Sequence, residues 1–187
     1  FTQNTIDSEG LVDNYISTVY VDSLQRIWIG SYMGGLFRFI PETENFISYS
    51  PPDLINSKFK NEIHVVTIAE NKDNMLLIGT ESNGLLLFDP EKESFADHPK
   101  NAELLSNMIM GFQYDVDGKL WISTSRGLSK FDAEENTLYN FTNSDGIESE
   151  GFYRNSIHDY PDGRIYVGSN AGLTFFNPAE VKVNPHI

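Results

Sequence analysis

The sequence contains no cysteine, so disulfide bonds and thiolate metal sites are excluded. Basic residues are also scarce, with 13 lysines and arginines against 27 aspartates and glutamates, which gives a formal net charge of −14. A nucleic-acid partner requires a basic surface that releases counterions from phosphates, so this charge argues against one. An anionic membrane surface or a polyanionic ligand is disfavoured for the same reason.

Long apolar runs and helical periodicity are missing as well. No stretch reaches the roughly 18 apolar residues of a membrane span, and no signal peptide is present, so we expect no membrane contact by this chain. Apolar residues alternate over short stretches, which predicts an all-β fold. The chain begins with Phe1 inside what reads as a repeat, and we therefore expect it to be a piece of a longer protein.

What the sequence does contain is a fourfold internal repeat. Each copy has a polar turn, an apolar strand ending in Ser or Thr, a Gly-Leu pair, and an aromatic residue three positions later. One position of the repeat is held by Trp28, Leu77, Trp121 and Tyr166, which lie 49, 44 and 45 residues apart. This period predicts a β-propeller with four four-stranded antiparallel blades. Their approximate bounds are 15–50, 63–99, 107–142 and 153–187.

Two local patterns give the expected strand arrangement within a blade. Asp117-Gly118 and Asp162-Gly163 lie between apolar runs and predict two-residue type I′ hairpin turns, whereas Leu24-Gln25 needs another turn. A small residue stands at the same point of the first strand in every copy, which is typical of the innermost strand of a propeller. These residues are Thr18, Thr67, Gly111 and Ser156.

The repeat resembles the two-component regulator propeller repeat. The third copy carries the resemblance through Asp115, Trp121-Ile122, Gly127-Leu128 and Phe131-Asp132, and the first through Trp28-Ile29-Gly30 and Gly34-Gly35-Leu36. The resemblance implies a periplasmic sensor region of a hybrid two-component histidine kinase from gut Bacteroidetes. Such regions typically detect oligosaccharides released from glycans. They contain whole seven-bladed propellers, so four blades imply a fragment of a larger ring.

Binding residues are expected on the side of each blade where the second strand connects to the third. The loops there are longer and more varied, and aromatic planes with amide and guanidinium donors suit sugars. More than half of the acidic residues fall in the polar turns of the opposite side, which we expect to stay free of ligand. The predicted ligand-binding residues are Tyr15, Tyr32, Asn83, Arg126, Tyr153 and Asn170.

We predict no catalytic residue, no metal site and no cofactor in this chain. The histidines lack the spacing of a helical zinc pair, and Asp115 to Gly118 lacks the further ligands of an EF-hand. Two alternatives stay open. One is a propeller lyase or other carbohydrate-active enzyme using His64 with Glu62 or Glu81, and the other is a structural or protein-binding propeller.

The first and last blades of a four-bladed piece are expected to have exposed faces. The first and last blades would each lack a neighbour and expose an apolar face, and repeat proteins depend on such interfaces. We therefore expect a homo-oligomer formed through blade edges, or a dimer of the parent protein.

Overall fold

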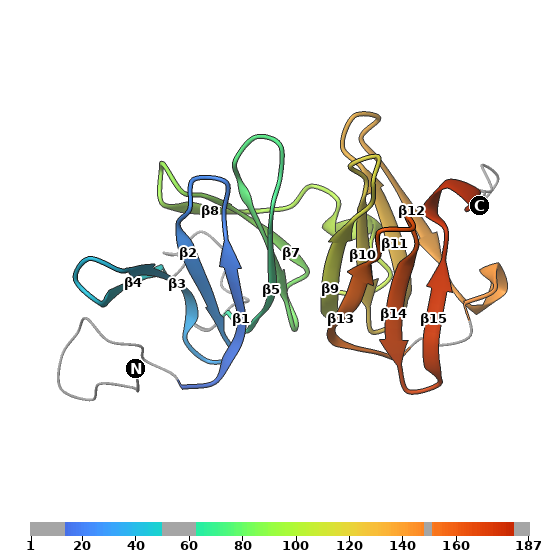
Figure 1. Cartoon of the computed structure of the whole chain (residues 1–187), viewed down its shortest axis with the longest axis horizontal. Coiled ribbons are helices and arrows are strands. Elements are labelled where there is room, and N and C mark those ends of the chain that lie inside the picture. The colour runs from blue at the N-terminus through green and yellow to red at the C-terminus, as the bar shows by residue number, and fades with distance from the viewer. Residues whose placement is uncertain (1–13, 50–62, 148–150, 182–187) are drawn as a thin grey trace. The chain divides into compact units, whose positions relative to one another are not determined.

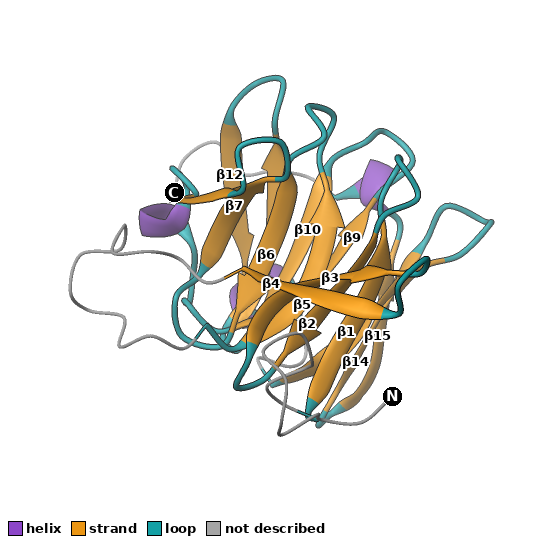
Figure 2. Cartoon of the chain, turned by 90° about the vertical axis from the view of Figure 1, so that its left-hand side faces the viewer, coloured by secondary structure: helices purple, strands orange, loops and turns teal. Residues whose placement is uncertain are grey.

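The computed structural model describes residues 14–49, 63–147 and 151–181. Within these residues, strands make up nearly all of the regular structure, and the helices are short 3-10 turns (Figure 2). None of those turns is long and apolar enough to cross a membrane. The chain divides into two compact units, residues 1–101 and residues 102–187.

Each unit contains two antiparallel sheets, in which neighbouring strands follow one another along the chain (Figure 1). The first unit holds β1 (Ile16–Val21), β2 (Ile27–Ser31), β3 (Gly35–Ile40) and β4 (Asn45–Tyr49) in one sheet. Its second sheet is β5 (Val65–Glu70), β6 (Leu76–Thr80), β7 (Leu85–Asp89) and β8 (Ser94–Asp97). The second unit holds β9 (Ile109–Tyr114), β10 (Leu120–Thr124), β11 (Gly127–Asp132) and β12 (Thr137–Phe141), followed by a sheet of β13 (Phe152–Asp159), β14 (Ile165–Ser169) and β15 (Gly172–Phe176). The short turns are η1 (Asn101–Glu103), η2 (Asn143–Asp145) and η3 (Pro178–Glu180).

The strand register confirms the predicted repeat. The recurring residue lies at the same place in the second strand of every blade, opposite a residue of the first strand. The pairs are Tyr20 with Trp28, Ala69 with Leu77, Gln113 with Trp121, and His158 with Tyr166. The chain is therefore all-β and built of propeller blades, as the sequence predicts.

Adjacent blades of a unit approach each other closely at their first strands. A Cβ atom added to Gly30 would lie 2.4 Å from Cγ1 of Val65, which belongs to the next blade. A Cβ atom added to Gly111 would lie 2.8 Å from Cγ2 of Ile157, again in the next blade. Bulk at this level would clash. Gly30 belongs to β2, which pairs with β1, whereas Gly111 belongs to β9 and has the steric role that the sequence predicts for the small residue of an innermost strand.

An apolar core fills the space between the two blades of each unit. In the first unit, the fully buried Trp28 lies 5.6 Å from Phe88 and 5.7 Å from Tyr49, measured between ring centroids. In the second unit, Trp121 lies 4.6 Å from Phe176 and 5.5 Å from Phe141. Burying large aromatic side chains contributes about 2–3 kcal/mol each, so these rings hold the blades of a unit together.

The predicted type I′ hairpin turns are wrong. Asp115 accepts a backbone hydrogen bond from Gly118 and donates one to Lys119, so the loop has three residues rather than two. Gly118 alone has positive φ in this loop, at 73°, which is the type I turn followed by a left-handed residue. The other blades form the same turn, with the left-handed position held by Gln25, Asn74 and Gly163.

The fourth blade shows only three strands among the described residues, where four were predicted. In the other blades a left-handed residue closes the turn into the fourth strand, at Glu44, Glu93 and Asn136. In the fourth blade, Val181 is at the position of these left-handed residues. Its φ is −71°, because a β-branched side chain disfavours positive φ. The turn after β15 begins as in other blades, because the side chain of Asn177 accepts a hydrogen bond from the N–H of Ala179, as Asp89 and Asp132 accept from Glu91 and Glu134. The difference among the described residues is at Val181.

The end blades expose apolar side chains, as expected. On the fourth blade, Leu173 and Phe175 are 64% and 56% exposed. On the first blade, Val19 and Val21 of β1 are 61% and 50% exposed, although Phe37 of the same sheet is fully buried. The equivalents of Leu173 in the first and third blades, Leu36 and Leu128, are buried against the following blade.

Candidate ligand-binding face

A buried hydroxyl ends the second strand of every blade and fixes the loop that follows. Each accepts a hydrogen bond from a backbone N–H two or three residues later, at 2.8 to 3.2 Å. In three blades the hydroxyl also donates to the carbonyl of the glycine that begins, or stands just before, the third strand. The residues are Ser31, Thr80, Thr124 and Ser169. We call this arrangement the hydroxyl bracket, and it explains why every copy has Ser or Thr there.

The residue after each bracket is hydrogen-bonded to the residue that immediately precedes the first strand of its blade. Its N–H donates to the carbonyl oxygen of that preceding residue, at 2.9 to 3.1 Å. The pairs are Tyr32 with Tyr15, Glu81 with His64, Ser125 with Met108, and Asn170 with Gly151. Each blade thus brings two side-chain positions together on one side, which we call the loop side.

In the first unit, these positions build a row of rings. The ring centroids of Tyr15 and Tyr32 lie 5.6 Å apart, and the His64 ring stacks on Tyr32 at 4.6 Å and 27°. Nδ1 of His64 lies 3.2 Å from Oε2 of Glu81. Tyr15 is 66% exposed, so the row reaches solvent. We call Tyr15, Tyr32 and His64, drawn from two adjacent blades, the aromatic row.

The structure therefore brings together two of the predicted residues, Tyr15 and Tyr32. Asn83 does not lie in the row, because it is 8% exposed and held inside its loop. Its N–H donates to Thr80, and its Oδ1 accepts from the Ser82 hydroxyl at 2.6 Å. The sequence places His64 and Glu81 on the loop side and in the enzymatic alternative, but it does not list them among the predicted binding residues. The stacking of His64 on Tyr32 depends on how neighbouring blades meet.

In the second unit, Arg126 and Asn170 are exposed on the loop side. Tyr153 is 58% exposed, but it is not the counterpart of Tyr15, a place that Gly151 takes. The reason is a wide bulge in β13. Phe152 pairs with Ser169 and Ile157 with Val167, so four residues of β13 stand opposite a single residue of β14.

On the opposite side, which we call the turn side, several acidic residues have structural partners. Asp22 accepts from the backbone N–H groups of Leu24 and Arg26 and from the Trp28 indole. Burial raises the pKa of Asp22, but the hydrogen bonds from Trp28 and Arg26 outweigh it and lower the pKa below its ordinary value. Lys119 lies 2.6 Å from Asp132 and lowers the pKa of that carboxyl.

Comparison with known sequences matches one segment of the chain to a family. Residues 10–33 match the family described as two component regulator propeller. The chain is 23% identical over 187 residues to histidine kinase P4 of Formosa agariphila. That alignment covers 98% of this chain and 14% of the relative, so the chain spans about one seventh of that protein.

Solved structures share the fold. The extracellular domain of a putative hybrid two-component system from B. thetaiotaomicron superposes with a TM-score of 0.81 at 20% identity, over 98% of this chain and 26% of that one. Virginiamycin B lyase from Staphylococcus aureus superposes with a TM-score of 0.60 at 13% identity, over 87% and 55%. At these identities the structural likeness concerns the fold alone. One segment of the chain therefore matches the two component regulator propeller family, and the chain over its length resembles part of a longer histidine kinase.

Proposed function

We propose that this chain, a two-component regulator propeller, is a ligand-sensing part of the periplasmic region of a hybrid two-component histidine kinase. The match to the regulator propeller family and the similarity to a histidine kinase support the sensor class. The fold is shared with the extracellular domain of a putative hybrid two-component system, which supports a location outside the cytoplasm.

The observation that carries a binding role is the aromatic row on the loop side. Ring faces pack against the apolar faces of sugar rings, and the neighbouring carboxylate of Glu81 can accept hydrogen bonds from hydroxyls. The proposed ligand is therefore an oligosaccharide that lies along Tyr15, Tyr32 and His64. Arg126 and Asn170 provide a guanidinium and an amide group on the loop side of the second unit, and the exposed Tyr153 is kept as a candidate.

Isothermal titration calorimetry with a panel of neutral and acidic oligosaccharides tests this function. We expect Tyr32→Ala to weaken binding by about tenfold or more, because it removes the central ring of the row. Tyr160→Ala is the matched control, since Tyr160 is 58% exposed and begins the β13–β14 turn on the turn side. Equal losses in the two variants, or binding to none of the panel, would count against the proposal.

We propose no catalysis by this chain, and the contact between His64 and Glu81 is the feature that an enzymatic alternative would use. A carboxylate beside an imidazole can orient it as a general base. Prolonged incubation with any bound oligosaccharide, followed by mass spectrometry, separates the two functions. Products that form with the original chain and disappear with His64→Ala would establish the enzymatic alternative.

Self-association is a separate part of the proposal. The exposed apolar side chains of the first and last blades are surfaces that a second copy can cover. We expect sedimentation velocity to show a concentration-dependent oligomer that Leu173→Asp weakens. A monomer at all concentrations would contradict this expectation.

A further inference from the structure

The aromatic row lies beside a carboxylate, that of Glu81. The backbone N–H of Glu81 donates to the carbonyl oxygen of His64, and its Oε2 lies 3.2 Å from Nδ1 of the imidazole. The His64 ring in turn stacks on Tyr32. These contacts hold the carboxylate next to the rings, and the Glu81 side chain still reaches solvent, since it is 19% exposed.

The charge around the row is negative. The described residues of the segments that carry the row are 14–16, 31–35, 63–65 and 80–84. Apart from the histidine, Glu81 is the one charged residue among them, and the chain as a whole has a net charge of −14. A sugar that carries a carboxylate or a sulfate group would be repelled at this site, because like charges brought together across an interface cost binding free energy.

A positively charged group would be attracted by the rings and by the carboxylate together. The face of a tyrosine ring carries partial negative charge and attracts an ammonium group. Tyr15 is 66% exposed, so a ligand can reach its ring. A carboxylate has about four acceptor positions on its two oxygens, so Glu81 can accept from a ligand N–H while it keeps its contact with His64.

The loop side of the second unit does not repeat this combination. The four equivalent positions there hold Met108, Ser125, Gly151 and Asn170, none of which has a ring. Arg126, which follows Ser125, adds a positive charge. Rings beside a carboxylate are therefore a property of the first unit.

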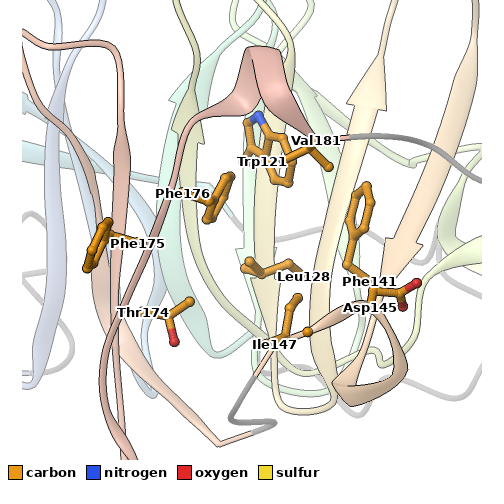
Figure 3. Close-up of a pocket in the computed structure, with 10 residues that line it drawn as sticks. Trp121, Leu128, Phe141, Asp145, Ile147, Thr174, Phe175, Phe176 and Val181 are labelled. Atoms are coloured by element: carbon orange, nitrogen blue, oxygen red, sulfur yellow. The ribbon is translucent and has the colours of Figure 1, made fainter.

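The apolar pocket in the core of the second unit is not an alternative site for a sugar (Figure 3). Its volume is about 130 Å³, and the rings of Trp121, Phe141 and Phe176 line it. Ligand pockets have volumes of roughly 300–1,000 Å³ and several polar groups, and hydroxyls buried without partners cost free energy. Sugar recognition is therefore assigned to the exposed aromatic row.

We propose that the aromatic row selects sugars that carry a protonated amino group, with Glu81 as the residue that determines this specificity. The inference rests on the proposed binding of an oligosaccharide along the row and adds the chemical class of the ligand. The sugar ring packs on the tyrosine rings, and its ammonium group lies at the carboxylate of Glu81. The rings provide affinity for sugars in general, and the carboxylate distinguishes amino sugars from sugars with hydroxyl, acetamido or anionic groups.

Isothermal titration calorimetry at about pH 7 with three β-1,4-linked trisaccharides tests the ligand class. Chitotriose carries amino groups, which are largely protonated at this pH, whereas triacetylchitotriose carries acetamido groups and cellotriose carries hydroxyl groups. We expect chitotriose to bind about fivefold or more tightly than the other two, because opposite charges roughly 4 Å apart contribute at least this factor. Added salt should weaken the binding of chitotriose more than that of cellotriose.

The variant Glu81→Gln tests the residue. It keeps the shape of the side chain and removes its charge, so the ratio of the affinities for chitotriose and cellotriose should fall to about one. Glu91→Gln is the matched control, because it removes the same charge from the same unit on the turn side, where the Glu91 side chain is 80% exposed. This control should leave the ratio unchanged.

The outcomes separate this inference from the proposed function. Equal affinities for the three trisaccharides, tighter binding of a uronic-acid trisaccharide than of chitotriose, an unchanged ratio in Glu81→Gln, or the same loss in Glu91→Gln would overturn the inference and leave the binding function in place. Binding of none of these sugars, or binding that Tyr32→Ala does not weaken, would overturn the proposed function and this inference with it.

Discussion

Nε1 of the Trp28 indole donates a hydrogen bond to Oδ2 of Asp22 at 2.8 Å, and both side chains are buried. The same carboxylate accepts the turn N–H groups of Leu24 and Arg26, so one side chain links the hairpin turn to the core. Asp115 and Trp121 repeat the arrangement at 2.9 Å. In the second blade Asn71 accepts the turn N–H groups, and Leu77 replaces the tryptophan.

We expect Asp22→Asn to lower the free energy of unfolding by about 1–3 kcal/mol. If the amide oxygen serves the turn, its NH₂ group faces the indole N–H, and two donors then meet in a buried site. In a Trp28→Leu background, which imitates the pairing of Asn71 with Leu77, the same substitution should cost less. Urea denaturation of the four proteins in this double-mutant cycle measures the difference, and additive effects would contradict the proposed coupling.

Gly30→Ala should destabilise the first unit by about 1–3 kcal/mol, because the new methyl group would lie 2.4 Å from Val65 of the next blade. Gly168→Ala is the matched control at the same repeat position. The nearest atom to a Cβ there is Cβ of Ser156, at 3.2 Å within its own blade. Thermal denaturation of both variants checks the prediction, which fails if the two melt alike.

Gln25→Gly should raise the free energy of unfolding by up to about 1 kcal/mol. Gln25 has φ of 63°, a conformation that costs most residues with a side chain about 1 kcal/mol or more and that glycine adopts freely. Glycine already holds this position in the third and fourth blades, as Gly118 and Gly163. Denaturant unfolding measures the change. Gln25→Val should have the opposite sign, and stabilisation by valine would refute the argument.

The stability of the fold should decrease as the pH falls from about 7 to 5, in part because of His98. Burial, and to a smaller extent the charge of Lys100, lower the pKa of His98 below its ordinary value. The unfolded chain therefore binds a proton near pH 6.5 that the folded chain takes up only at lower pH, and this favours unfolding. His98→Gln should flatten the dependence measured by urea denaturation, and an unchanged slope would exclude a contribution from His98.

The sequence alone was sufficient for the strand register, because four copies carry the same pattern. Trp28 and Trp121 fix the second strand, and the small residues at Thr18 and Gly111 fix the first. The sequence alone was not sufficient for the turns between the first and second strands. Pairing of the flanking strands holds Gln25 in a left-handed conformation that its side chain does not favour. Among the described residues β15 is not followed by a fourth strand, and Val181 could have indicated this, because its branched side chain disfavours the left-handed conformation of the turn.

The sequence placed Tyr15 and Tyr32 on one side of a blade, but it did not give the assembly of the aromatic row. Tyr15 and Tyr32 belong to one blade, so the loop pattern placed both on the same side. His64 stacks on Tyr32 from the next blade and brings Glu81 with it, and no spacing within one repeat gives that contact. Tyr153 was displaced because the bulge in β13 adds residues that a regular repeat does not contain.

The hydroxyl bracket separates the constraints on the fold from those on recognition. Ser31, Thr80, Thr124 and Ser169 shape each loop through bonds to the backbone, and the outward side chain that follows takes no part in those bonds. Evolution can therefore exchange the residue at 32, 81, 125 or 170 while the blade keeps its geometry. If the loop side binds ligand as proposed, substitutions at these few equivalent positions change the ligand while the fold of the repeat is kept.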